Sequence, residues 1–211
     1  MKLILSGGGD QEDSSPLDRE FATWIGQERF LYLPFASRDR GDGYAGHLAW
    51  LRSVFEPLGL SNPVMWTSFY GRTAKDLAGF AGVYIGGGNT FKLLQLLKQT
   101  RFDRLLLDYL KNGGAVYGGS AGAIVLGQDI ASCAHDDPND VRLADTTGLN
   151  LLNGHDVWCH YTTDQARSVQ EYCNRTHRPV YALTERSGLK ITENGIQSIG
   201  LEAHVTFTPS L

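Results

Sequence analysis

The stretch Ala115-Val116-Tyr117-Gly118-Gly119-Ser120-Ala121-Gly122-Ala123-Ile124 decides how the centre of the chain folds. It reads as an apolar strand ending in two glycines, then a serine, then an apolar helical segment. Residues 118–122 match the pattern G-x-S-x-G in the strand-turn-helix context of a nucleophile elbow. Such a turn needs small neighbours, because it holds its serine in a strained conformation with the hydroxyl beyond the sheet edge. We therefore predict a nucleophilic Ser120; the alternative is a chance match in a chain with 25 glycines.

Two further glycine runs, at residues 7–9 and 86–88, also follow apolar segments that read as strands. Helical patterns lie between the strands; in one of them Pro16 occupies the first position and Leu17 and Phe21 share one face. This alternation predicts an α/β fold, with a mostly parallel sheet and helices on both faces. Ligands of such sheets bind beyond the carboxyl ends of the strands. Asn194-Gly195, between two apolar segments, predicts a β-hairpin near the C-terminus.

Length and composition narrow the class of protein. The 211 residues, 42% hydrophobic and 20% charged, predict one domain over residues 1–211. A net charge of -4 argues against a nucleic-acid partner. Apolar runs are too short for a membrane span or a signal peptide, so we expect a cytoplasmic protein.

Cofactor and metal patterns are absent from the sequence. The three cysteines are odd in number and lack C-x-x-C spacing, which indicates neither a disulfide framework nor a zinc site. G-x-G-x-x-G fails in both glycine runs, because Glu12 and Phe91 occupy the last glycine position. We therefore expect no metal and no organic cofactor.

A serine nucleophile needs a base, and six histidines are available. His160 ends an apolar segment at residues 156–160, hence at the sheet edge that displays Ser120, and it is our predicted base. A histidine satisfied within the core is the alternative reading, and His135 is a second candidate. For the orienting acid, a Ser…Asp…His chain order favours Asp136 and Asp137, while Glu185 stays open because it follows a predicted strand.

Four blocks of sequence together resemble the dipeptidase E (alpha-aspartyl dipeptidase) family of serine peptidases, relatives of cyanophycinase. The blocks, which extend along nearly the whole chain, are residues 84–91 (YIGGGNTF), 118–123 (GGSAGA), 160–161 (HY) and 182–185 (ALTE). The resemblance implies a class I glutamine-amidotransferase-like fold, with Ser120 as nucleophile and His160 as base. It also implies an oxyanion hole formed by the backbone amides of Gly88 and Ala121, although the glycine loop also reads as a purely structural turn. Asn89, in the same loop, is an expected substrate contact.

The resemblance further implies removal of N-terminal aspartate from dipeptides without a cofactor. The family's acid lies in an Asn-Asp-Met-Pro-like stretch, which corresponds here to His135-Asp136-Asp137-Pro138, so two carboxylates compete and we favour Asp136. The segment after His160 is shorter than in enterobacterial members, in which an arginine reads the aspartyl side chain. Arg167 is our candidate for that role; a surface arginine paired with Glu171 is the alternative.

We therefore expect a serine exopeptidase whose partner is a small peptide, present as a monomer or a homodimer. Three rivals stay open: a hydrolase of another amide, such as the β-aspartyl peptide of cyanophycinase; a non-catalytic binding module of the same fold; and a nucleotide-binding protein.

Overall fold

The computed structural model describes residues 1–38, 41, 42 and 44–210. These residues form a seven-stranded sheet in which five neighbouring strands are parallel and the last two are antiparallel. In spatial order its strands are β3 (Pro63–Met65), β2 (Phe30–Leu33), β4 (Gly82–Ile85), β5 (Ala115–Gly119), β1 (Lys2–Ser6), β8 (Ser187–Thr192) and β9 (Gly195–Gly200). β8 and β9 are joined at Glu193 and Asn194, so the predicted hairpin is confirmed.

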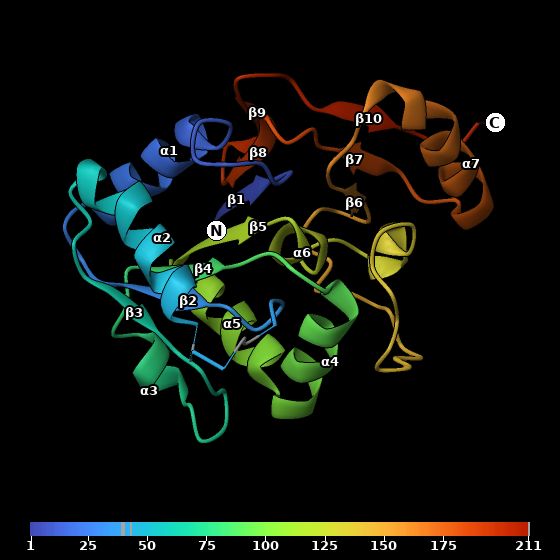
Figure 1. The fold of residues 1–211 in the computed structure, drawn as a ribbon. Coiled ribbons are helices and arrows are strands. Elements are labelled where there is room, and N and C mark those ends of the chain that lie inside the picture. Colours follow the sequence, from blue (N-terminus) through green and yellow to red (C-terminus); the bar gives the residue numbers. More distant parts are fainter. Residues whose placement is uncertain (39–40, 43, 211) are drawn as a thin grey trace.

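Helices cover both faces of this sheet (Figure 1). The helices are α1 (Ser15–Ile25), α2 (Ala45–Phe55), α3 (Ala74–Leu77), α4 (Thr90–Thr100), α5 (Phe102–Lys111), α6 (Ala121–Ile124) and α7 (Ala166–Thr176), with 3₁₀ turns η1 (Glu56–Leu58), η2 (Ile130–Cys133) and η3 (Thr163–Gln165). Side chains alternate along each strand: Ile4 packs in the cluster of α1 and α2, whereas Leu3 and Leu5 pack in the cluster of α4 and α5. Strands buried on both faces explain why their sequences are continuously apolar. The predicted mostly parallel α/β fold is confirmed.

A second, three-stranded sheet lies beside the first, next to α7 (Figure 1). It consists of β6 (Asp156–Trp158), β7 (Val180–Ala182) and β10 (Val205–Phe207). The sequence predicted β6 and β7 as strands but not their separate sheet, and it did not predict β10. At the start of β6, the buried Asp156 accepts hydrogen bonds from Tyr172 (2.7 Å) and Arg178 (2.8 Å). Sequence periodicity does not report such a contact.

Among the described residues, no helix is both long and apolar enough to cross a bilayer.

One buried carboxyl group lies between α1 and the sheet. Asp18 is 3% exposed, and its Oδ2 lies 2.7 Å from the hydroxyl of Ser14. No ion pair to Asp18 is present within the described part of the chain, and burial raises its pKa from 3.8 to about 6. The folded protein therefore binds this proton more tightly than the unfolded chain does.

We predict that ionisation of Asp18 destabilises the fold as the pH rises. A group with a raised pKa in the folded state supports stability below pH 4 and loses that contribution as the pH passes 6. The pKa difference of about two corresponds to about 3 kcal/mol. Urea unfolding between pH 4 and pH 8 should therefore show Asp18→Asn gaining stability over the natural chain as the pH rises. A constant difference between the two proteins across this range would contradict the raised pKa.

Candidate active site

Ser120 occupies the turn between β5 and α6 in a strained conformation. Its φ is 49° and its ψ is -111°, a region that a residue other than glycine enters only when its surroundings impose it. The backbone amide of Ser120 donates to the carbonyl of Ser6 (3.0 Å), and its own carbonyl accepts the amides of Ala123 and Ile124. A Cβ at Gly122 would overlap the carbonyl oxygen of Ile85. These contacts are those of the nucleophile elbow predicted from the sequence.

Three side chains form a continuous hydrogen-bonded chain at this turn. The Oγ of Ser120 lies 2.9 Å from Nε2 of His160, and Nδ1 of His160 lies 3.0 Å from Oε1 of Glu185. An ionised carboxylate only accepts hydrogen bonds, so Nδ1 carries the proton and Nε2 is free to accept the proton of the serine hydroxyl. The arrangement has the geometry of a nucleophile, a base and an orienting acid.

The end of β1 positions the histidine as well as the serine. The amide of His160 donates to the carbonyl of Gly7 (3.0 Å), one residue after the carbonyl that accepts Ser120. Gly8 has a φ of 122°, and a Cβ there would overlap the imidazole ring of His160. The sequence pattern at residues 7–9 reads only as a failed dinucleotide motif and does not predict this role. The glycine run directly after β1 is the sequence feature that could have indicated close packing of another residue against this turn.

The structure does not bring Asp136 or Asp137 to His160, so the favoured choice of Asp136 is corrected in favour of Glu185. Oδ2 of Asp136 lies 3.3 Å from Nε2 of His135, while Oδ2 of Asp137 accepts the amide and hydroxyl of Thr90. Thr90 is the first residue of α4, where free amides favour a carboxylate. The acidic loop is therefore held on a helix terminus and not on the imidazole.

The glycine loop and the elbow each offer a backbone amide beside Ser120. Ala121 is the first residue of α6, and Gly88 lines the same pockets as Ser120. Within the described residues, neither amide donates a hydrogen bond to the protein. Free amides in these positions are compatible with an oxyanion hole, which stays a prediction.

The two predicted substrate contacts have other partners. Asn89 caps α4 through its oxygen, which accepts the amide of Lys92 (2.8 Å), and its Nδ2 donates to the carbonyl of Pro138. Arg167 lies on α7 with its side chain 90% exposed, where Nε is 2.8 Å from Glu171. Arg167 lines neither pocket beside Ser120. The structure thus has the ion pair of the surface-arginine alternative, because four residues along a helix bring the two charges together on the solvent face.

Two small pockets adjoin the catalytic geometry, one of about 270 Å³ and one of about 230 Å³. Ser120, His160 and Gly88 line both. Cys133 and Cys159 line the second, but burial raises the pKa of Cys133 to about 12 and that of Cys159 further, so both remain thiols. Thiols of this kind are poor nucleophiles, so we do not expect either cysteine to compete with the hydroxyl of Ser120.

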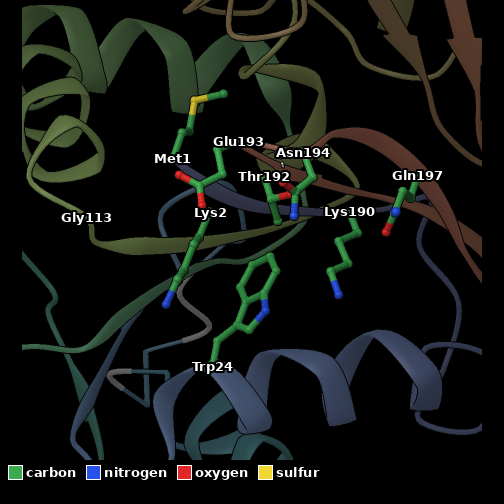
Figure 2. A pocket seen from close by; sticks show the side chains of 9 residues that line it. All are labelled: Met1, Lys2, Trp24, Gly113, Lys190, Thr192, Glu193, Asn194 and Gln197. Atoms are coloured by element: carbon green, nitrogen blue, oxygen red, sulfur yellow. Dashed lines mark hydrogen bonds between the residues drawn. The ribbon is translucent and has the colours of Figure 1, made fainter.

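A larger hollow of about 590 Å³ lies by the start of β1, at the opposite end of that strand from Ser6. Figure 2 shows Lys2 and Trp24 reaching into it, with Lys190 nearby. Lys190 is paired with Glu20 and lies 5.8 Å from the centre of the Trp24 ring. Neither Ser120 nor His160 nor Glu185 lines this hollow, so it is not part of the candidate active site.

No cluster of three or more His, Cys, Asp or Glu side chains in the described part of the chain could hold a metal ion.

We predict that Gly8→Ala removes activity by displacing the imidazole. The new Cβ would collide with the ring of His160, and a shift of about 1 Å in a catalytic group can cost about 100-fold in rate. Gly195→Ala is the matched control, because Gly195 also has a positive φ (105°) but open space around it. Both variants should lose stability, and only Gly8→Ala should lose turnover of peptide p-nitroanilides. Equal activity in the two variants would remove Gly8 from the role of positioning His160.

Comparison with known proteins identifies the relatives of this chain. The model of peptidase family S51 matches residues 3–199. Uncharacterized peptidase Lmo0363 of Listeria monocytogenes is 30% identical over 146 residues, which cover 67% of this chain and 70% of the relative. Peptidase E of Shewanella denitrificans is 33% identical over 72 residues, covering 34% of this chain and 28% of that protein.

Two solved structures share the fold. One is a Listeria monocytogenes protein provisionally described as a peptidase E, with a TM-score of 0.75, 24% identity and coverage of 95% of this chain and 98% of the other. The second is a peptidase from an acI-B1 Actinobacterium, with a TM-score of 0.73, 16% identity and coverage of 100% and 95%. The family resemblance read from the four sequence blocks is thereby confirmed. The chain belongs to peptidase family S51.

Proposed function

We propose that the chain is a serine-type exopeptidase that cleaves short peptides with an N-terminal aspartate. The observation that carries the serine mechanism is the continuous path from Ser120 Oγ to His160 Nε2 (2.9 Å) and from His160 Nδ1 to Glu185 (3.0 Å). Membership of a peptidase family supports peptide-bond hydrolysis as the reaction. The aspartate preference follows from the resemblance to the dipeptidase E family.

The proposed reaction begins with attack of Ser120 Oγ on the peptide carbonyl carbon. Nε2 of His160 takes the hydroxyl proton, and Glu185 stabilises the imidazolium that forms. The free amides of Gly88 and Ala121 are placed to stabilise the negative oxygen of the tetrahedral intermediate. His160 then returns the proton to the leaving amine, and water hydrolyses the acyl-enzyme with the same base.

The dimensions of the site favour small substrates. Pockets of about 270 Å³ and 230 Å³ on the two sides of Ser120 and His160 suit one or two residues of a peptide. The side chains of His160 and Glu185 are 41% and 55% exposed, so the site is open to solvent and to a small peptide. A panel of aspartyl, asparaginyl and alanyl p-nitroanilides, together with β-aspartyl peptides, tests the substrate class directly.

We predict that Ser120→Ala lowers turnover of aspartyl p-nitroanilide by about three orders of magnitude or more, because the attacking oxygen is lost. The natural chain should react with a fluorophosphonate at Ser120, and the variant should not. Circular dichroism checks that the variant is folded. Near-normal turnover by a folded Ser120→Ala protein would exclude the serine mechanism.

The orienting acid is tested by comparing Glu185→Gln with Asp136→Asn. Glutamine cannot hold the imidazole through an ionised acceptor, so Glu185→Gln should lower kcat by about 100-fold or more. Asp136→Asn should have a much smaller effect on kcat, because Asp136 contacts His135 and not the catalytic imidazole. A larger loss in Asp136→Asn than in Glu185→Gln would return the role to the acidic loop.

A further inference from the structure

An enzyme that prefers N-terminal aspartate needs a cation near the acyl side of its substrate. Among the described residues that line the two pockets beside Ser120, none is an arginine or a lysine. The second pocket instead carries Asp136 and Asp137, whose charge repels a carboxylate. Arg167 is on the surface of α7. The cation must therefore come from another part of the surface around the site.

A neighbouring hollow of about 450 Å³ contains a cation, the side chain of Arg38. It is lined by Ser37, Arg38, Asp42, Gly46, His47 and Trp50. Trp50, on α2, also lines the 270 Å³ pocket that contains Ser120. Its ring is 37% exposed and packs edge to face on Tyr84, with the centroids 6.2 Å apart. One indole side chain thus borders both the catalytic pocket and the hollow.

Hydrogen bonds to backbone carbonyls hold this hollow against the glycine loop. The hydroxyl of Ser37 donates to the carbonyl of Gly87 (3.1 Å), and the amide of Asn89 donates to the carbonyl of Ala36 (2.8 Å). Nζ of Lys92 donates to the carbonyl of Ser37 (2.9 Å). Arg38 follows this anchored pair directly, so its long side chain starts beside the loop that carries the predicted oxyanion amide.

The charges of the hollow leave its cation available. Arg38 is exposed and forms no ion pair with any described residue. His47 lies with Nδ1 3.0 Å from the Tyr32 hydroxyl; when that hydroxyl donates, Nε2 carries the proton and can donate to a ligand. Asp42 opposes an anion, although its Oδ1 accepts the amide of Tyr44 (3.1 Å). An arginine fork and an imidazole donor together match a carboxylate.

We propose that Arg38 is the residue that reads the aspartyl carboxylate, with the substrate lying against Trp50 and its acidic side chain in this hollow. The inference rests on the proposed peptidase function and names its specificity determinant. Asp42 lowers the affinity of the hollow for the carboxylate, since two like charges then share it.

The experiment measures binding in a catalytically silent protein, so that it does not depend on turnover. Calorimetry compares the dipeptides Asp-Ala and Asn-Ala on Ser120→Ala, and on Ser120→Ala combined with Arg38→Met, Asp42→Asn or Arg167→Met. Arg38→Met should weaken Asp-Ala binding by about 10- to 100-fold and leave Asn-Ala binding unchanged, as expected for a lost charged contact. Asp42→Asn should tighten Asp-Ala binding by a few-fold. Arg167→Met, a matched loss of an exposed arginine, should change neither.

Equal effects of Arg38→Met on both peptides, or no effect on either, would overturn the assignment, and so would unchanged Asp-Ala binding in Asp42→Asn. The same substitutions in the active protein are then compared by kcat/KM on aspartyl and alanyl p-nitroanilides, with fluorophosphonate labelling of Ser120. Arg38→Met should lower the ratio of aspartyl to alanyl kcat/KM, and Arg167→Met should leave that ratio unchanged. If the fluorophosphonate does not label Ser120 in the natural chain, the proposed serine-peptidase function is contradicted. The binding data would still decide the role of Arg38.

Discussion

The turn at the end of β1 is the constraint on which the catalytic geometry depends. The carbonyls of Ser6 and Gly7 accept the amides of Ser120 and His160, two residues that lie forty positions apart in the chain. The amide of Gly7 in turn donates to the carbonyl of Ser187, which follows the segment of Glu185. Two successive residues at the end of one strand, Ser6 and Gly7, therefore fix the backbone positions of Ser120 and His160 and bond to the segment next to Glu185. The hydrogen bonds are backbone bonds, so they need glycines and close approach more than they need particular side chains.

Two strained residues are stabilised by that framework. Ser120 and His160 both have positive φ values, 49° and 52°, at a cost of about 1–3 kcal/mol each. Each strained residue has its amide bonded to β1, which lies in the middle of the large sheet between β5 and β8. Hydrogen bonds to the end of a largely buried central strand thus offset the strain. Because the strained conformations aim both side chains at one point, the nucleophile and the base are in contact before substrate arrives.

The two sides of the site differ in whether their polar side chains are already bonded within the protein. On one side of the site, Asp137 accepts the amide of Thr90 at the start of α4, and Asn89 donates to the carbonyl of Pro138. The polar atoms on this side are therefore already hydrogen-bonded within the protein. On the other side, α2 presents Trp50 beside the hollow that contains Arg38. Arg38 forms no ion pair with any residue that the structure describes. Recognition and chemistry can therefore change independently in this arrangement. A loop and one helix can vary while the strand ends that hold the triad remain.

Local sequence was enough to predict the strands of the large sheet and the turn at Ser120, because each depends on neighbours within a few residues. It also pointed to His160, but the contact of His160 with Ser120 depends on the distant carbonyl of Gly7, which accepts the amide of His160. Apolar segments that end in glycines give parallel strands, and parallel strands bring their carboxyl ends to one edge. The family resemblance identified the reaction class from the same short blocks.

The choice between Asp136, Asp137 and Glu185 needed tertiary structure, since the sequence leaves all three open and only the path of the chain decides which one reaches the imidazole. Chain order favoured the acidic loop, but the free amides of α4 bind Asp137, and the turn after β7 brings Glu185 to 3.0 Å from His160. Arg167 was misplaced for the same reason, because its partner Glu171 is local whereas a substrate contact is not. The second sheet was also beyond the sequence, since strand pairing between β7 and β10 joins segments more than twenty residues apart. Local patterns determine which groups a chain offers, and long-range packing determines which of those groups meet.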